Sequence, residues 1–376
     1  QMPNYFVSVK ATTWPYNIPG LFDYNLARLP FTDISLASTT HIVRHQHEVS
    51  TADIREPLKA NGKLMCTIVR KGSSYVVETG LIAGITTDRM WIALNYYPEV
   101  QKSQTARLDI GDVFRLGKVR FRVKELPDST QSNLEDTVSS SELFEGSLTS
   151  VAQYTRHNTC VALECSSSNE ACRICLDEED SDCDPLISVC KCTGSLKHIH
   201  LTCLKEAIRV RCSVTTHRGV TRYSWKSLVC ELCQSALPLS FIVNSVSHEL
   251  LSFTKPSSET LVLEELMRRK SDQRVTYYIV DLSEKHHISM GSSELNDINI
   301  GREQTISQFH AFLKYSKGTL YLHDNGSKFG TLLQNMKGVL LKQSQPVFAQ
   351  FGQSCLLISL EQEVHKKKGW FSRLFD

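Results

Sequence analysis

The chain has 376 residues, enough for two or three ordinary domains, and its 41% hydrophobic and 22% charged content allows each domain to bury a core. Its formal net charge of +2 gives no general attraction to nucleic acid or to anionic membranes, so neither is expected as a partner. No stretch approaches the roughly 18 uninterrupted apolar residues of a membrane-spanning helix, so no transmembrane segment is expected.

Residues 1–126 have the pattern of a β-domain. Short runs of β-branched and aromatic residues, such as FVSVK, LMCTIV and SSYVVET, are bounded by Gly, Ser, Asn or Lys. The clearest strand signal is the alternation of Val119, Phe121 and Val123 with basic residues, which predicts one buried and one solvated face. We interpret the basic face as a wet strand surface and not as a nucleic-acid contact.

Residues 127–170 differ in composition from the segments on either side. This stretch is rich in Ser, Thr and acidic residues and has too few large apolar residues to form a core. It is therefore predicted to be a flexible linker that is open to phosphorylation.

Residues 171–240 hold nine of the thirteen cysteines, and seven of these form four close pairs with His200. The pairs are Cys172 and Cys175, Cys190 and Cys192, His200 and Cys203, and Cys230 and Cys233. Structural zinc takes four such ligands in a tetrahedron, so eight ligands predict two zinc ions, neither able to activate water. Because the segment has few large apolar residues, its folding should depend on the metal.

Other interpretations of these residues are weaker. His198 competes with His200 as a ligand, but its spacing is less typical of zinc sites. Cys183 and Cys212 fall outside the pairs and are expected to be plain thiols. A disulfide-rich extracellular protein is the poorer alternative because the spacing is that of a metal site. The first ten residues lack the layout of a signal peptide, so a reducing compartment, cytoplasmic or nuclear, is expected.

The ligand order of four cysteines, one histidine and three cysteines resembles the RING-CH zinc finger of membrane-associated and viral ubiquitin ligases. The texts CRICL, PLISVCKCTGSLKHIHLTCL and CELC are similar to that family. PHD fingers share the order, but they usually have a wider second pair and a Trp where this chain has Leu228. The resemblance implies a cross-brace, in which the two zinc ions bind Cys172, Cys175, His200 and Cys203, and Cys190, Cys192, Cys230 and Cys233.

This resemblance implies an E3 ubiquitin-protein ligase, which brings a ubiquitin-conjugating enzyme to a substrate and contributes no nucleophile. The implied docking surface consists of Ile174 and the helix that begins CLKEAI, with Leu204 and Ala207. Relatives usually have Trp at the position of Ala207, and loss of such an anchor weakens an interface. The alternative is therefore a non-enzymatic, zinc-stabilised adaptor or a structural subunit of a larger assembly.

Residues 241–361 are predicted to form a second β-domain with the segment that leads into it. The candidate strands VTYYIVDL, FHAFLKYS, GTLYLHD, GVLLK and SCLLISL are separated by turn residues, which suggests a β-sandwich. The run ETLVLEEL fits either a strand or a short helix. The basic tail at 362–376 is expected to be a frayed terminus.

The text ISMGSSELNDINIGREQTISQFHAFL, followed by LYLHDNGSKFGTLL, resembles a forkhead-associated (FHA) domain, a β-sandwich that binds phosphothreonine peptides. Ser307 and His310 fit the Ser-x-x-His element of that family, in which His310 is expected to brace the loop. Ser327, Gly330 and Thr331 fit the turn that follows.

Two peptide-binding residues of the FHA pattern are replaced in this chain. The phosphate-binding Arg aligns with Ser292, and the peptide-binding Asn aligns with Phe329. Serine cannot imitate the bidentate, charged grip of arginine on phosphate. Arg302, in a neighbouring loop, is the alternative phosphate ligand, beside Ser307.

The N-terminal β-domain resembles a degenerate FHA domain, since GDVFRLGKVRFRV is similar to the closing strands of that fold. The expected fold is multidomain and mainly β, with FHA-like β-sandwiches flanking a small zinc-stabilised cross-brace α+β RING-CH domain. This combination resembles proteins of ciliates. The expected partners are a ubiquitin-conjugating enzyme and a protein substrate, phosphorylated or not.

Overall fold

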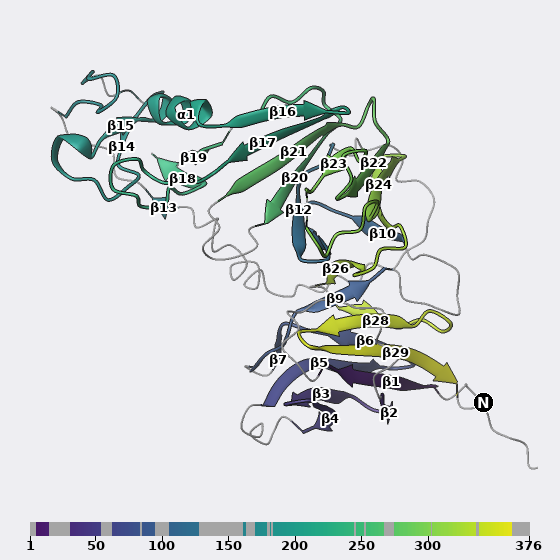
Figure 1. The fold of residues 1–376 in the computed structure, drawn as a ribbon. Coiled ribbons are helices and arrows are strands. Elements are labelled where there is room, and N and C mark those ends of the chain that lie inside the picture. Colours follow the sequence, from purple (N-terminus) through teal and green to yellow (C-terminus); the bar gives the residue numbers. More distant parts are fainter. Residues whose placement is uncertain are drawn as a thin grey trace, which may run out of the picture.

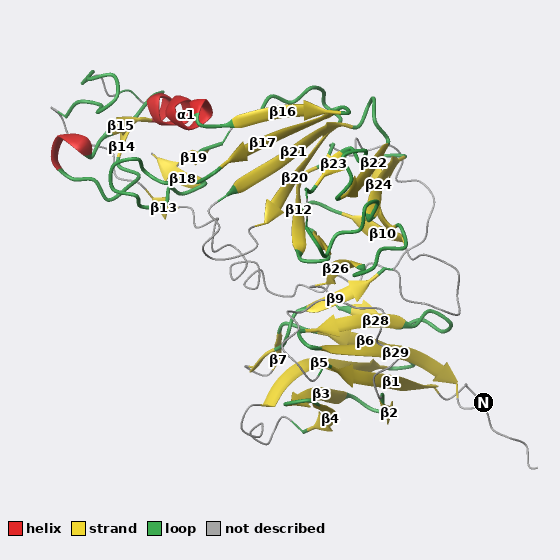
Figure 2. Ribbon diagram, viewed as in Figure 1, coloured by secondary structure: helices red, strands yellow, loops and turns green. Residues whose placement is uncertain are grey.

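The computed structural model is mainly β-sheet, which confirms the multidomain, mainly β fold (Figure 1). Figure 2 shows strands throughout; the described residues contain one α-helix, α1 (Leu201–Val210), and one 3-10 turn, Gly194–Leu196. The structure describes residues 5–14, 31–53, 62–82, 85–94, 105–127, 161–162, 170–178, 181, 183–243, 246–251, 253–266, 274–301, 303–335 and 338–362.

The first β-sandwich lies at the bottom of Figure 1. One of its sheets has the order β27-β6-β5-β3-β4, and the other is the β9-β28-β29-β1-β2 end of a 12-stranded sheet. Val9, Ile68, Tyr75 and Phe351 lie in the core between them. The strands are β1 (Tyr5–Thr13), β2 (Thr32–Leu36), β3 (Thr40–His45), β4 (Glu48–Ala52), β5 (Gly62–Lys71), β6 (Ser74–Glu78), β9 (Met90–Ala93), β27 (Val339–Leu340), β28 (Val347–Phe351) and β29 (Ser354–Gln362), with a small hairpin of β7 (Leu81–Ile82) and β8 (Ile85–Thr86).

The second β-sandwich continues from the first, because the same 12-stranded sheet supplies one of its layers in the order β21-β20-β12-β11-β26. The facing layer has the order β10-β25-β24-β22-β23. Phe114, Phe121, Leu263 and Leu313 are buried between the layers. The strands are β10 (Thr105–Leu108), β11 (Val113–Leu116), β12 (Val119–Glu125), β20 (Thr260–Leu266), β21 (Val275–Asp281), β22 (His287–Gly291), β23 (Ile298–Asn299), β24 (Ala311–Ser316), β25 (Thr319–Asp324) and β26 (Thr331–Asn335).

The closing strands of the two sandwiches are exchanged. β10, β11 and β12 follow the first sandwich along the chain but pair with β25, β26 and β20 of the second. Conversely, β27, β28 and β29 follow the second sandwich but pair with β6, β9 and β1 of the first. The expected contiguous domains, 1–126 and 241–361, therefore differ from the two sandwiches. The hydrophobic pattern did not reveal this exchange, because it fixes which face of a hairpin is buried but not which strand the hairpin pairs with.

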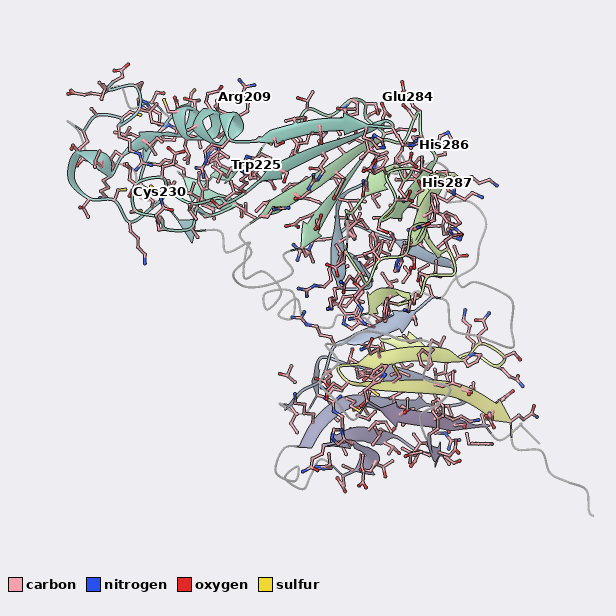
Figure 3. The ribbon with its side chains drawn as sticks, in the orientation of Figure 1. Arg209, Trp225, Cys230, Glu284, His286 and His287 are labelled. Carbon is pink, nitrogen blue, oxygen red and sulfur yellow. The ribbon has the colours of Figure 1, made fainter. Side chains whose placement is uncertain are left out.

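The cysteine-rich segment lies beside the second sandwich and is joined to it by a hairpin. β17 pairs antiparallel with β21 from Val220–Val280 to Trp225–Val275, and β16 forms the outer edge of the 12-stranded sheet. Figure 3 labels Trp225 and Cys230 in this part of the molecule. The remaining elements are β13 (Val161–Ala162), β14 (Leu186–Ile187), β15 (Ile199–His200), β16 (Ser213–His217), β17 (Val220–Trp225), β18 (Ser240–Val243) and β19 (Val246–Glu249).

Local patterns account for most of these elements. Val119, Phe121 and Val123 are buried and the basic residues between them are not, as the alternation predicts. The ambiguous run ETLVLEEL forms strand β20. Within the expected linker, β13 pairs in parallel with β18, so this short part of it is structured. The rest of the linker, apart from residues 127 and 170, and nearly all of the basic tail lie outside the described residues.

Candidate metal centre

Two groups of four side chains have their ligand atoms within 4.8 Å of one another. The first cluster is Cys172, Cys175, His200 and Cys203, and the second cluster is Cys190, Cys192, Cys230 and Cys233. Each cluster takes two pairs that are far apart in the sequence, so successive pairs alternate between the clusters. This interleaved arrangement is the cross-brace that the sequence resemblance implies.

A tight turn and the start of α1 shape the first cluster. Leu176 has a φ of 64°, and its N–H donates to the Cys172 carbonyl at 2.8 Å, which closes the turn that carries Cys172 and Cys175. The Cys172 Sγ accepts the His200 N–H at 3.4 Å. His200 ends β15, its Nδ1 lies 3.2 Å from the Cys175 Sγ, and Cys203 follows within α1. Backbone structure therefore fixes all four ligands.

The second cluster repeats this local geometry. Gln234 has a φ of 57°, and its N–H donates to the Cys230 carbonyl at 3.0 Å. The Cys192 and Cys230 Sγ atoms lie 3.8 Å apart, and the Cys233 Sγ lies 3.1 Å from the Ser235 Oγ. The same kind of turn thus presents a cysteine pair to each cluster.

Arg173 connects the two clusters. It belongs to the first turn, but its Nη1 lies 3.5 Å from the Cys190 Sγ and its Nη2 lies 3.7 Å from the Cys230 Sγ, both in the second cluster. Its Nη1 also donates to the Leu196 carbonyl at 2.9 Å, which fixes its direction. Sequence reasoning missed this residue; the available signal was a lone Arg directly after the first ligand.

The structure keeps His198 out of both clusters. The His198 side chain is buried and its Nδ1 contacts the Glu170 carboxylate. Cys183 is exposed and Cys212 is partly buried, and neither belongs to a cluster. The spacing argument therefore selected the histidine that the fold brings to the ligands.

Within each cluster the thiols differ in their affinity for protons. Burial opposes ionisation of Cys172, but hydrogen bonds from backbone N–H groups outweigh it and lower its pKa to about 7. Burial and hydrogen bonds with neighbouring thiols raise the pKa of Cys203 to about 12. In the second cluster, hydrogen bonds from Ser235 lower the pKa of Cys233 to about 6, whereas burial raises that of Cys192 to about 12. Four crowded thiols cannot all ionise without a cation among them.

The donor sets fit zinc. Three thiolates with one imidazole, and four thiolates, are ligand sets that structural zinc sites use, and a coordinating thiol gives up its proton to the metal. The two clusters therefore fit two zinc ions. Since four protein ligands close each site, zinc would supply rigidity here and have no open position for an activated water.

The residues expected to dock a conjugating enzyme differ in accessibility. Ile174, in the first metal-binding turn, is 49% exposed, and Ala207 on α1 is partly buried. Leu204 is only 3% exposed, because it forms the buried face of α1 with Leu201 and Ile208. Leu204 therefore has no docking role in this structure. Leu204 lies three residues after Leu201 and four residues before Ile208, and this spacing is typical of the buried face of a helix.

Leu232 is an exposed apolar side chain that sequence reasoning missed. It lies between Cys230 and Cys233, as Ile174 lies between Cys172 and Cys175, and it is 56% exposed. The signal was present in the text CELC, which matches CRIC in form. Each metal-binding turn thus presents an apolar side chain to solvent at this position, and Leu176, at 77% exposure, is a second one in the first turn.

The second sandwich brings two of the expected phosphopeptide residues together. The Ser292 N–H donates to the Ser307 carbonyl at 3.1 Å, and the Ser307 Oγ accepts the Lys328 N–H at 3.0 Å. Arg302, the proposed alternative phosphate ligand, lies outside the described residues.

His310 is buried behind the loop that carries Ser307. Its Nδ1 accepts the Ser307 N–H at 3.0 Å, so its Nε2 carries the proton and donates to the Gly330 carbonyl at 3.1 Å. Burial lowers the pKa of His310, although the Gly330 carbonyl and Asp324 act against it. His310 therefore connects two loops as a neutral side chain.

Two family models match parts of the chain. The RING-variant domain model matches residues 172–233, which include both clusters, and the FHA domain model matches residues 288–348. The chain carries a RING-variant domain and an FHA domain. No solved structure matches the chain.

Several E3 ubiquitin-protein ligases are similar to part of this chain. The E3 ubiquitin-protein ligase MARCHF8 of Bos taurus is 31% identical over 117 residues, which is 31% of this chain and 32% of the relative. The E3 ubiquitin-protein ligase MARCHF1 of Homo sapiens is 29% identical over 119 residues, 32% of this chain and 33% of the relative. The E3 ubiquitin-protein ligase MARCHF7 of Rattus norvegicus is 36% identical over 72 residues, 19% of this chain and 9% of the relative.

The chain therefore spans about a third of the length of the first two relatives. Among the described residues, no helical segment has the length and apolarity that a membrane crossing requires.

Proposed function

We propose that this protein is a RING-type E3 ubiquitin-protein ligase, with the RING-variant domain as its platform for a ubiquitin-conjugating enzyme. The observation that carries the proposal is a RING-variant domain whose two closed clusters each present an exposed apolar side chain, Ile174 and Leu232. The relatives that match this region are named as E3 ubiquitin-protein ligases, which supports the same assignment.

The chemistry assigned to this platform is recruitment. Zinc closed by four protein ligands offers no position for a reacting water or substrate, so the ubiquitin thioester arrives on the conjugating enzyme. Ile174 and Leu232 stand on turns that the ligands hold in place, so little order is lost when a partner covers them. Burying one such side chain contributes about 1.5–3 kcal/mol.

We assign the second sandwich to recognition of the protein substrate. An FHA domain is a protein-recognition module, and Ser307 keeps the position that meets phosphopeptide in the family. Ser292 lacks the charge and the paired donors of arginine, so phosphate recognition requires Arg302 or a different ligand group. Recognition of a phosphorylated substrate is therefore a more specific proposal than recognition of a protein substrate in general.

The ligase assignment is tested by ubiquitin-chain formation with purified activating enzyme, ubiquitin and a panel of conjugating enzymes. We expect chains with wild type, a loss of at least tenfold in rate with Ile174→Ala or Leu232→Ala, and no chains with Cys190→Ser. Leu295→Ala serves as the matched control, because Leu295 is at least as exposed, at 64%, but lies in the second sandwich.

The second candidate is a non-enzymatic adaptor stabilised by zinc. Ala207 favours it, because a helix without an aromatic anchor at that position offers a smaller contact. Absence of chains from metal-loaded wild type with every conjugating enzyme would establish this candidate and refute the ligase.

The substrate assignment is tested by titrating matched threonine and phosphothreonine peptides and measuring affinity by calorimetry. Preference for the phosphorylated peptides that disappears in Arg302→Ala supports Arg302 as the phosphate ligand, whereas binding that survives this change excludes it.

Because the clusters need free thiols, we assign the protein to a reducing compartment, the cytoplasm or the nucleus.

A further inference from the structure

The two sandwiches are related by a near-mirrored strand order. Across the centre of the 12-stranded sheet the order is β20-β12-β11-β26 followed by β9-β28-β29-β1. Each strand on one side of the central β26–β9 pair has a counterpart on the other, and chain order agrees, since β9 precedes β10–β12 and β26 precedes β27–β29. The first sandwich is thus closed by β27–β29, which follow the second sandwich in the chain, and the second sandwich is closed by β10–β12, which follow the first.

The closing hairpins can be compared residue by residue from their turns. Gly117 in the β11–β12 turn and Gly352 in the β28–β29 turn have φ values of 53° and 57°, a left-handed conformation that favours glycine. Counting from these glycines, Arg122 corresponds to Leu357 and Val119 corresponds to Ser354. The two hairpins therefore have the same shape but different side chains at the positions that meet the neighbouring strand.

The first difference concerns charge. Arg122 is opposite Glu264 of β20, with 3.1 Å between Nη1 and Oε2, whereas its counterpart Leu357 is opposite Lys10 of β1. If each hairpin closed its own sandwich, Arg122 would be opposite Lys10. Like charges directly opposite on neighbouring strands are destabilising, and opposite charges are stabilising.

The second difference concerns a buried arginine. Arg44 of β3 is 7% exposed and donates to the Phe351 carbonyl at 2.8 Å and to the Ser354 Oγ at 3.2 Å, while it pairs with Asp88 at 2.9 Å. In an unexchanged sandwich Val119 would replace Ser354, and Arg44 would lose one acceptor. A buried charged donor without its acceptor costs more than the bond itself contributes.

The third difference lies at the other hairpin turn. The Lys118 N–H donates to the Thr305 Oγ1 at 3.1 Å, and a Cβ added at Gly117 would lie 2.3 Å from the Thr305 carbonyl oxygen. The corresponding Cβ at Gly352 would lie 3.3 Å from the ends of the Arg44 and Asp88 side chains. Each turn therefore fits closely against the sandwich in which it is found.

We propose that these side chains specify a reciprocal exchange of closing strands within one chain, so that each sandwich is completed only by the other. The 12-stranded sheet is continuous from the β16–β17 hairpin of the metal-binding segment to the first sandwich through the β26–β9 pair, and the exchanged hairpins connect the chain across this pair in both directions. Such a sheet would hold the metal-binding platform and the first sandwich at a fixed distance and orientation; Figure 1 shows the two at opposite ends of it. This proposal does not depend on ligase activity.

A charge-reversal cycle in the 376-residue chain tests the pairing. Arg122→Glu and Glu264→Lys should each raise the unfolding equilibrium constant, and the double variant should restore it, with a coupling of about two- to fivefold for a pair near the surface. Arg122→Glu combined with Lys10→Glu should show no coupling. Coupling between residues 122 and 10, or coupling in neither pair, overturns the proposal.

Hydrogen exchange locates the effect of each hairpin. Gly117→Ala should reduce amide protection in β20–β25 and leave β1–β6 protected, whereas Ser354→Val should do the opposite. Loss of protection in the sandwich that precedes the mutated hairpin in the chain would contradict the exchange.

Light scattering of the wild-type protein distinguishes an exchange of strands within one chain from an exchange between two copies of the chain. A mass of 42.5 kDa together with the crosswise protection pattern supports exchange within the chain. Twice that mass with the same pattern would mean exchange between two copies and would overturn the intrachain proposal.

Discussion

The Arg173 guanidinium reaches out of the first cluster to within 3.5 Å of the Cys190 sulfur in the second. A cluster of four thiolates around a zinc ion carries a net charge of about −2, and a cationic donor beside two of its sulfurs offsets part of it. Arg173 itself belongs to the first metal-binding turn, where it lies between the ligands Cys172 and Cys175. The two clusters are therefore coupled through one side chain as well as through the interleaved backbone.

Replacing Arg173 with Ala should weaken zinc binding at the second cluster by about 10–100-fold, the usual cost of removing an outer partner of a metal ligand. Competition with a chromogenic chelator measures the zinc affinity of both sites, and only one of the two affinities should fall. Arg173→Lys, which keeps the charge but not the fork of donors, should recover part of the loss. Equal weakening of both sites would contradict the assignment of Arg173 to the second cluster.

Removing zinc should unfold the metal-binding segment and leave the first sandwich folded. Leu186, Ile199, Leu204 and Ile208 share a core with two of the metal ligands, Cys172 and Cys230, so loss of the metal should open this part of the core. With 1,10-phenanthroline at neutral pH, amide protection should fall in α1 and persist in β1–β6. The 1,7 isomer, which cannot chelate, is the control, and persistent protection of α1 after complete metal loss would refute this dependence.

Trp225 should contribute both packing and a hydrogen bond at the junction between α1 and the 12-stranded sheet. Its Nε1–H donates to the Ile208 carbonyl at 3.0 Å, and its ring packs against Tyr223, Phe253 and Tyr277. Trp225→Ala should lower the free energy of unfolding by about 3–5 kcal/mol. Trp225→Phe keeps an aromatic ring and removes the donor, so we expect a smaller loss, about 1–3 kcal/mol. Denaturant unfolding of zinc-loaded protein provides the comparison.

The loop behind Ser307 should loosen as the pH falls. The pKa of His310 in the folded protein lies below its ordinary value of 6.5 because the side chain is buried. A histidine with a lowered pKa contributes stability that is fully present above about pH 6.5 and decreases at lower pH, since the unfolded state binds the proton more tightly. Protonation also removes the Nδ1 acceptor of the Ser307 N–H.

Amide exchange of Ser307 between pH 7.5 and 5.5, corrected for intrinsic rates, measures this effect. His310→Gln carries no titratable group and should show a flat corrected profile. An equally steep profile in that variant would assign the effect to another group.

The metal ligands were predictable because their chemistry constrains sequence spacing directly. Two ligands in one turn must lie two or three positions apart, so His200 could be distinguished from His198 without a structure. The strands were predictable wherever burial alternates, as in β12. Leu204 was assigned to the wrong face, although the helical spacing that buries it was visible. Arg173 was not predictable, since its role depends on the distance between two turns.

The partners of the closing hairpins depend on contacts across more than a hundred residues. Arg122 and Leu357 occupy matching places in two similar hairpins, and either hairpin satisfies the alternation that predicts a closing strand. The choice between them lies in single opposing residues, Glu264 and Lys10. Such pairs become informative only once the register of both strands is known.

The exchanged strands also impose an order of events on synthesis. The last N-terminal strand of the first sandwich ends at Ala93, but its closing strand β29 ends at Gln362, about 270 residues later. At about 5–20 residues per second, a ribosome needs roughly 13 to 54 s to cover that interval. During this time β1 and β9 have open edges, which invite pairing with other chains. The first sandwich is therefore a natural client for a chaperone until β29 has been synthesised.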